Sequence, residues 1–406
     1  MSHDDDAAQW WRDAPTLQRV VSDLLAGEMA LMRPGVGHRA PPWPRGFDLR
    51  ADLGADSLDL MGLGSAMEAM LQLPPAPGVP LLNRTGLVDW VDAACAGLAR
   101  DGGALTFRTS GSSGAPKPCT HRLALLWQEA DALASLFDGR RRIVSLVASH
   151  HIYGFLFSVL LPRRLGMGPD AVLDLRGHAP GAVAGQLRPG DLVLGFPEAW
   201  RALARAADGI APDVVGVSST APCPDEVAHA VAGAGLARLV QVYGSSETAG
   251  VGWRDRAQDG YTLFSYWRRG AQPEQLWRRL PDGSEQAVAL QDRLAWPAPD
   301  RFLPCGRIDL AVQVGGVNVF PAYVADVLRL HPAVRDASVR LMRPDEGQRL
   351  KAFVVPHEAA SIDAAMLQTW MAARLSAPEC PAAYSFGAGL PRQANGKPAD
   401  WIIDTW

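Results

Sequence analysis

The sequence Thr106-Phe-Arg-Thr-Ser-Gly-Ser-Ser-Gly-Ala-Pro-Lys117 is the most informative stretch of the chain. Its hydroxyl and backbone N–H groups suit phosphate oxygens, and its glycines allow a ligand to approach closely. A flexible Ser/Gly linker is the alternative, but strand-like apolar residues precede the stretch and Lys117 adds a point charge. The stretch is not the P-loop motif, because Gly114 lies three residues before Lys117 and no Ser or Thr follows. We therefore predict a phosphate-binding loop of another kind.

Short apolar runs follow this loop and alternate with helical stretches. The runs are rich in β-branched residues and are bounded by Gly, Pro or Asp, which is typical of buried parallel strands in an α/β domain. They cover residues 142–149, 191–197, 214–219 and 238–244. Further on, three strand candidates and two helix candidates predict a small α+β domain in residues 310–406. Those strand candidates are residues 310–316, 337–342 and 350–356.

The first hundred residues have a different pattern. Residues 16–32 carry apolar side chains at helical spacing, and a shorter apolar helix is expected from Leu87 to Leu98. Between them, Asp56 is a plausible N-cap for a third helix. The apolar stripe predicted for this helix consists of Leu58, Met61, Leu63, Met67 and Met70. Residues 15–98 are therefore expected to form a small helical bundle.

The composition excludes several classes of protein. The 406 residues carry a net charge of −4, which argues against a nucleic-acid partner. No apolar run is long enough to span a membrane, and the acidic N-terminus is unlike a secretory signal, so we expect a cytoplasmic protein without a membrane partner. The five cysteines are scattered and odd in number, which argues against disulfides or a zinc site.

Lysine is rare in this sequence. There are 36 arginines but only three lysines, Lys117, Lys351 and Lys397. Two of the three lie within the motifs described here, as expected where a compact ammonium group on a flexible stem is required.

Four motifs together resemble the adenylate-forming (ANL) superfamily, which includes acyl- and aryl-CoA synthetases and peptide-synthetase adenylation domains. The stretch ending at Lys117 is similar to its phosphate loop, and residues 242–248 are similar to its Y-G-x-T-E segment, with Ser246 in place of the usual Thr. Residues 306–309 match its G-R-x-D hinge, and residues 390–397 match its C-terminal L-P-x-x-x-x-G-K. The motifs occur in the family order, and the resemblance covers residues 104–406.

This resemblance implies a role for each matching residue. Tyr243 would stack on adenine, Glu247 would hold Mg²⁺ on the phosphates of ATP, and Lys397 would neutralise charge during adenylation. Asp292 would bind the ribose; it lies 15 residues before Arg307, although Leu-Gln precedes it instead of the usual Thr-Gly. The catalytic residues would be Lys397, Glu247 and Lys117. The residues that bind the nucleotide would be Thr109, Ser110, Gly111, Ser112, Ser113, Gly114, Ser219, Thr220, Tyr243, Gly244, Ser246, Asp292 and Arg307.

The acid and thiol sites follow from the same resemblance. His151 and Tyr153 would border the acyl pocket; the alternative is a His pair at the end of a strand. Asp309 would be the hinge about which the C-terminal domain swings before the thiol enters. Residues 313–321 would line the thiol channel and resemble the phenylacetate-CoA ligase branch, which favours an aromatic acid. Gln313 and Asn318 stand where the family often has Lys and Arg, so the contacts to the acceptor stay open.

The N-terminal region resembles a second family. Residues 52–59, Asp-Leu-Gly-Ala-Asp-Ser-Leu-Asp, are similar to the phosphopantetheine attachment sequence of acyl carrier proteins. Ser57 would then carry 4′-phosphopantetheine at a helix N-terminus, where free N–H groups favour a phosphate ester. The alternatives are an ordinary helical bundle with an Asp-Ser N-cap, and a carrier-like domain that serves only for docking.

Together these observations predict an α/β protein with three parts. A carrier-like helical domain would occupy residues 15–98, a shortened adenylating domain residues 101–309, and a mobile α+β domain residues 310–406. The predicted activity is ATP- and Mg²⁺-dependent formation of an acyl-AMP from an aromatic acid, such as a hydroxybenzoate, and transfer to the phosphopantetheine thiol of a carrier protein, either its own N-terminal domain or a separate protein. The chain would then resemble the ligases of aryl-polyene pigment synthesis. The alternatives are an acyl- or aryl-CoA synthetase that uses free CoA, and a non-catalytic carrier or scaffold.

Overall fold

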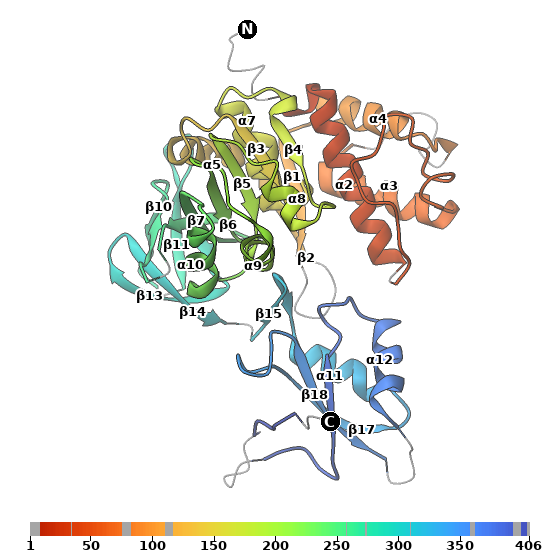
Figure 1. Cartoon of the computed structure of the whole chain (residues 1–406). Helices are drawn as coiled ribbons and strands as arrows, with labels where there is room; N and C mark the ends of the chain where they lie inside the picture. The colour runs from red at the N-terminus through yellow and green to blue at the C-terminus, as the bar shows by residue number, and fades with distance from the viewer. Residues whose placement is uncertain are drawn as a thin grey trace. The chain divides into compact units, whose positions relative to one another are not determined.

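The computed structural model describes residues 9–33, 35–74, 83–109, 117–256, 258–272, 274–308, 310–357, 362–392 and 399–403. The chain forms two compact units (Figure 1). The first unit holds the residues up to 306, except the short stretches 33–36 and 109–117, which group with the second unit from residue 307 onward. Within the described residues, no helix is both long and apolar enough to cross a membrane.

A nine-stranded sheet forms the centre of the first unit, in the order β13-β14-β9-β8-β7-β6-β5-β3-β4. The strands from β4 to β7 pair in parallel, which confirms the parallel strands predicted from the apolar runs. Strands β7, β8, β9 and β14 pair antiparallel and extend the sheet. The bounds are β3 (Arg142–Ser145), β4 (Val172–Asp174), β5 (Asp191–Gly195), β6 (Val215–Ser218), β7 (Arg238–Ser245), β8 (Ala249–Arg254), β9 (Tyr261–Leu263), β13 (Asp292–Ala298) and β14 (Arg301–Arg307).

Helices cover both faces of the parallel part of this sheet. Neighbouring side chains on a strand point to opposite faces, so Ile143 and Val144 belong to two different hydrophobic cores. The core around Val144 packs under α8 (Pro180–Ala184), α9 (Pro197–Ala206) and α10 (Asp225–Gly233). The core around Ile143 includes α5 (Leu123–Leu136), α6 (Ile152–Phe155), the π-helix η3 (Leu156–Leu160) and α7 (Leu161–Arg164).

The N-terminal helices share this second core. They are η1 (Trp10–Arg12), α2 (Ala14–Met32), α3 (Ser57–Leu71) and α4 (Leu87–Arg100), and α2 packs against both α3 and α4. Trp10 meets Phe155 of α6 edge to face, with 5.0 Å between the ring centroids. These helices and the sheet form one compact unit, so the boundary expected near residue 100 does not separate two units. The apolar contacts across it explain why.

Helix α3 begins as predicted but faces the core differently. Asp56 is its N-cap and forms a capping box with Asp59, each side chain accepting from the other's backbone N–H. The predicted apolar stripe is wrong at its start, because Leu58 and Met61 are 76% and 53% exposed. Leu60 is buried in their place, so the buried face of the first turn is rotated relative to the prediction.

Smaller sheets complete the first unit. Strands β1 (Ala104–Thr109) and β2 (Lys117–Arg122) pair on either side of the predicted phosphate loop. Strands β10 (Trp267–Arg269), β11 (Gln275–Arg279) and β12 (Glu285–Ala289) form an antiparallel sheet. The strand-like apolar residues before the loop had indicated β1, but β2, β10, β11 and β12 were not predicted, because they are short and rich in polar residues.

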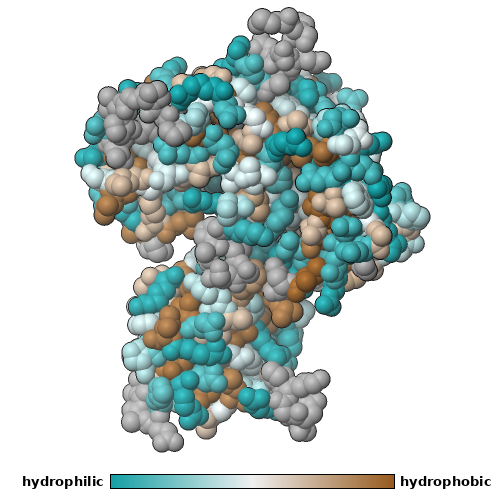
Figure 2. Space-filling view, turned by 180° about the vertical axis from the view of Figure 1, so that it is seen from behind, coloured by the Kyte–Doolittle hydropathy of each residue, from teal (hydrophilic) through white to brown (hydrophobic). Residues whose placement is uncertain are grey.

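The second unit is the predicted α+β domain. A hairpin of β15 (Val312–Val314) and β16 (Val317–Val319) precedes α11 (Pro321–Arg329). A sheet follows, in which β18 (Leu350–Pro356) pairs antiparallel with β17 (Val334–Leu341) and parallel with β19 (Ala383–Phe386). Helix α12 (Ala364–Ala372) lies between β18 and β19 in the chain. Figure 2 shows hydrophobic side chains on the surface of this unit, where Leu310, Leu330 and Ile402 are exposed.

Candidate active site

Tyr243 lies at the carboxyl end of β7, the edge at which open α/β sheets bind their ligands. Its hydroxyl donates a hydrogen bond of 2.5 Å to Oδ2 of Asp292, the first residue of β13. Its ring also meets Phe302 at 5.2 Å and Tyr261 at 5.6 Å between centroids. The structure therefore brings together the two residues that the sequence predicted for adenine and for ribose, although they are far apart in the chain.

The predicted segment beside the adenine lies next to the same strand. Ser219 follows β6, and its hydroxyl donates to the carbonyl oxygen of Val242 at 2.9 Å. Thr220 has a φ of +76°, in the left-handed region that a β-branched residue rarely adopts. Such backbone strain is frequent at ligand-binding turns. The turn is thus held against the residue that precedes Tyr243.

Gly244 allows the chain to turn back after Tyr243. A Cβ atom at Gly244 would lie 2.3 Å from the carbonyl oxygen of Ala249, so no other residue fits without a shift of the backbone. The register between β7 and β8 changes at this point. The turn that results contains Ser246 and Glu247, and the side chains of Ser245 and Thr248 bond to each other at 3.1 Å across it. Glu247 is therefore presented by a tight and well-bonded turn.

Glu247 faces an open cleft of about 370 Å³ in the first unit. Thr120, Arg122 and Arg278 also line this cleft, which gives it one carboxylate beside two guanidinium groups. Guanidinium groups and hydroxyls suit phosphate oxygens, and a single carboxylate suits Mg²⁺ that takes its other ligands from phosphates and water. Among the described residues no three His, Cys, Asp or Glu side chains cluster as a metal site. The cleft thus fits a nucleotide polyphosphate with its cation.

Sequence reasoning missed His121, which also lines this cleft. Its Nε2 donates to the carbonyl oxygen of Ser246 at 2.6 Å, so strand β2 is bonded directly to the Glu247 turn. Burial lowers the pKa of His121, although its bond to Ser246 opposes this shift, so the ring is neutral at pH 7. The only signal in the sequence that could have indicated His121 was its position four residues after Lys117, near the far end of a strand.

A buried carboxyl group holds the other end of the turn. Both oxygens of Glu129 on α5 accept from the N–H of Gly250, at 3.0 and 2.9 Å. The carbonyl oxygen of Gly250 accepts from the Tyr266 hydroxyl and from the Trp267 indole N–H. Arg278 is buried beside these two rings. Sequence reasoning missed this group entirely, because its members come from four separate elements, α5, β8, β10 and β11.

The predicted acyl-pocket residues lie in the turn before α6 and in α6 itself. Tyr153 is buried, and its hydroxyl donates to the carbonyl oxygens of Gly195 and Val217, 3.1 Å away. That hydroxyl therefore fastens the turn to the ends of β5 and β6. His151, in contrast, is exposed. A Cβ at Gly154 would lie 1.9 Å from the carbonyl oxygen of Ala148, so Gly154 is required for the turn, a requirement that the sequence did not reveal.

The remaining predicted residues divide into two groups. Thr109 ends β1, Lys117 begins β2, Arg307 ends β14, and Ser57 is the exposed first residue of α3. The others lie outside the residues that the structure describes. They are Ser110, Gly111, Ser112, Ser113, Gly114, Asp309 and Lys397.

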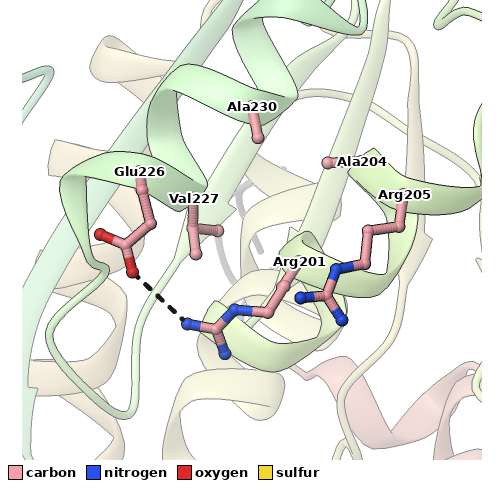
Figure 3. Close-up of a pocket in the computed structure, with 6 residues that line it drawn as sticks. All are labelled: Arg201, Ala204, Arg205, Glu226, Val227 and Ala230. Atoms are coloured by element: carbon pink, nitrogen blue, oxygen red, sulfur yellow. Dashed lines mark ion pairs between the residues drawn. The ribbon is translucent and has the colours of Figure 1, made fainter. Parts of the chain in front are cut away.

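A smaller hollow of about 180 Å³ lies between α9 and α10 (Figure 3). Arg201 and Arg205 point from α9 towards α10, and Arg201 pairs with Glu226 at 3.8 Å. None of the predicted site residues lines this hollow. The cleft at Glu247 therefore remains the candidate active site.

Comparison with known proteins agrees with this geometry. A family model described as AMP-binding enzyme C-terminal domain matches residues 323–397. The 4-coumarate–CoA ligase of Halorhodospira halophila is 36% identical over 395 residues, which cover 95% of this chain and 98% of that protein. The 4-coumarate–CoA ligase of Cereibacter sphaeroides is 37% identical, with 96% and 97% covered.

The fold also matches solved structures. The amide bond synthetase from Marinactinospora thermotolerans aligns with a TM-score of 0.62 at 19% identity, over 94% of this chain and 92% of that one. This similarity concerns the fold. It extends through the N-terminal helices as well as the sheet and the second unit.

Proposed function

The chain belongs to the AMP-forming acid–thiol ligases, and we propose that its acid is aromatic and that its thiol is that of coenzyme A. The observation that carries this proposal is the similarity to two 4-coumarate–CoA ligases over nearly the whole length of all three chains. A hydroxycinnamate such as 4-coumarate therefore replaces hydroxybenzoate as the expected substrate. The alternative of a non-catalytic carrier or scaffold is no longer favoured, because the relatives that match nearly the whole chain are ligases.

The chemistry would proceed in two steps. In the first, a carboxylate oxygen of the acid attacks the α-phosphorus of ATP. The bond between the α-phosphorus and the oxygen that bridges it to the β-phosphate breaks, and pyrophosphate leaves. In the second, the thiolate of coenzyme A attacks the acyl carbon and AMP leaves. Mg²⁺, when bound, would neutralise phosphate charge, and Glu247 would be its protein ligand.

The residues of the chain would bind and orient the reactants. Tyr243 and Asp292 would hold adenosine, since their side chains already lie together at the edge of the sheet. Arg122 and Arg278 would face the departing pyrophosphate from the cleft at Glu247. Lys117 and Lys397 would supply positive charge at the α-phosphate, where negative charge develops.

The direct test is ATP–pyrophosphate exchange with 4-coumarate, cinnamate, benzoates, phenylacetate and fatty acids, followed by product analysis with coenzyme A. We expect exchange with the hydroxycinnamates and formation of a CoA thioester. Lys397→Ala should abolish exchange and leave the fold intact. Exchange with fatty acids alone would overturn the aromatic assignment, and near-normal exchange in Lys397→Ala would overturn the role of that lysine.

Transfer to a carrier protein, the first interpretation of the sequence, becomes the second candidate. Its support is Ser57, which is exposed at the N-terminus of α3 with Arg50 Nη2 only 3.2 Å from its hydroxyl oxygen. Leu58 and Met61 next to it are exposed as well. Incubation with a phosphopantetheinyl transferase and coenzyme A tests this candidate by mass spectrometry. One added phosphopantetheine on Ser57 would support the N-terminal helices as the carrier, and an unchanged mass would exclude Ser57 as the acceptor and favour a role of these helices in docking.

A further inference from the structure

Helix α2 is bonded to the turn that carries the His pair through a buried carboxylate. Asp23 is 2% exposed and accepts from both the N–H and the hydroxyl of Ser149, each at 2.6 Å. Arg176 pairs with Asp23 and also with Asp174, the last residue of β4. A buried carboxylate with several charge-assisted partners holds a fixed geometry. Ser149, which directly precedes His150, is therefore fixed to α2.

One turn further along α2, Gly27 faces the His pair directly. A Cβ atom at Gly27 would lie 2.8 Å from Nε2 and 3.0 Å from Cε1 of His150, which is closer than real Cβ atoms come to other atoms. The ring of His150 lies against that of His151, with 4.0 Å between centroids. The absence of a side chain at Gly27 thus leaves room for the His150 ring, against which the His151 ring lies.

Both histidines of the pair carry lowered pKa values. The side chain of His151 is exposed, and yet desolvation by the surrounding protein lowers its pKa, with Asp23 opposing and Arg176 adding to that shift. The pKa of His150 is lowered well below its usual value by burial, and also by His151 and Arg176. Both rings are neutral at pH 7. A neutral aromatic wall suits the flat, uncharged part of an aromatic acid.

We propose that α2 is a part of the acid-binding site, in which Gly27 and Asp23 are positioning residues that set the place of the His151 ring and so determine which acids fit. The inference rests on the proposed function and on the expectation from the sequence that His151 borders the acyl pocket. The N-terminal helices are then a component of the catalytic unit, which agrees with the hydrophobic core that they share with the sheet.

Gly27→Ala tests the proposal. Ala is the better helix former, so the change favours the helix itself and its effect arises from the contact with His150. We expect the KM for the best aromatic acid to rise roughly tenfold, since small displacements at a substrate wall have effects of this size. The KM for ATP should stay unchanged. Gly233→Ala in α10 is the matched control, because a Cβ there meets no atom within 4 Å.

A double-mutant cycle with His150→Ala identifies the route of the effect. If Gly27 acts through the His150 ring, Gly27→Ala should have no further effect on the acid KM once that ring is removed. Equal effects in both backgrounds, or an unchanged acid KM in Gly27→Ala, would overturn the proposal. If Gly27→Ala folds poorly, His150→Ala alone must still change the relative KM values of acids of different width, and unchanged relative values would likewise overturn it.

ATP–pyrophosphate exchange by the unaltered enzyme shows whether a negative result concerns the proposed function or only the proposed role of α2. If the unaltered enzyme shows no exchange with aromatic acids but exchanges with another class, the proposed function fails. The Gly27→Ala measurement is then made with the acid that is used, and it still decides whether α2 shapes the site. If the unaltered enzyme uses aromatic acids and Gly27→Ala matches its control, the inference alone fails.

Discussion

Nζ of Lys351 lies 2.7 Å from the carbonyl oxygen of Trp401. The side chain of Lys351 is completely buried, and its ammonium group also contacts the carboxylates of Glu346 at 2.8 Å and Asp400 at 3.0 Å. The pKa of Glu346 is lowered, chiefly by its bond to Lys351. Strand β18 therefore holds the chain a few residues after Lys397. The one lysine that the sequence motifs did not explain has a structural role beside the one assigned to catalysis.

Lys351→Met is expected to destabilise the second unit by about 1.5–3 kcal/mol, because it removes the hydrogen bonds of a buried ammonium group to Glu346 and to the Trp401 carbonyl. Pyrophosphate exchange should fall as well, since the segment with Lys397 loses its attachment to β18. Denaturant unfolding and exchange assays measure the two effects. Arg335→Met, at an exposed position on the neighbouring strand, is the control and should change stability by less than about 1 kcal/mol. Equal stability of the two variants would contradict the role of Lys351.

Asp292→Ala is expected to raise the KM for ATP by about tenfold or more, because hydrogen bonds to a charged group contribute roughly 1.5–3 kcal/mol. Tyr243→Phe keeps the ring and removes only the hydroxyl that orients Asp292, so its effect should be smaller. Neither change should alter the KM for the acid. Steady-state kinetics with ATP and acid varied separately give both constants. A larger effect from Tyr243→Phe than from Asp292→Ala would show that the hydroxyl acts on its own.

The sequence predicted those parts of the fold that local patterns encode. Apolar runs gave the parallel strands, and Asp56 was recognisable as an N-cap because a capping box is a local motif. The buried face of α3 was misjudged at Leu58 and Met61, because that face depends on how α3 packs against α2. Tertiary contacts of this kind have no local signal.

The same distinction holds for the candidate site. Tyr243, Glu247 and Asp292 were predicted from motifs, and Tyr243 and Asp292 are in contact. Glu129 and Arg278 were not, since Glu129 holds the end of the Glu247 turn and Arg278 lines the same cleft from elements far away in the sequence. Gly154 carried no signal in the sequence, because only its contact with the Ala148 carbonyl explains why glycine is required there.

Gly154→Ala is expected to destabilise the protein by about 1–3 kcal/mol or more, because the new methyl group would overlap the backbone of Ala148 and force the turn to move. The movement would displace His151, so acid binding should weaken more than ATP binding. Gly233→Ala is again the matched control. Thermal unfolding and the two KM values test the prediction. A Gly154→Ala variant as stable and active as its control would show that the turn adapts freely.

Glu129→Gln tests the buried carboxyl group behind the Glu247 turn. Burial raises the pKa of Glu129 from 4.5 to about 7, although Arg278, the N–H of Gly250 and Tyr266 oppose the shift. Between pH 4.5 and about 7 the unfolded chain releases this proton while the folded chain retains it, so the stability that Glu129 contributes falls as the pH rises. Below this window, both states are protonated.

Glutamine does not titrate, and it retains an oxygen that accepts from the N–H of Gly250. The stability of Glu129→Gln relative to the unaltered protein should therefore increase with pH, by up to about 3 kcal/mol across this window, since one pKa unit corresponds to 1.36 kcal/mol. Urea unfolding of both proteins at pH 5, 6, 7 and 8 measures the difference. A difference that stays constant over this range would mean that Glu129 is already ionised at pH 5. In that case the attraction of Arg278 and Gly250 would exceed the cost of burial.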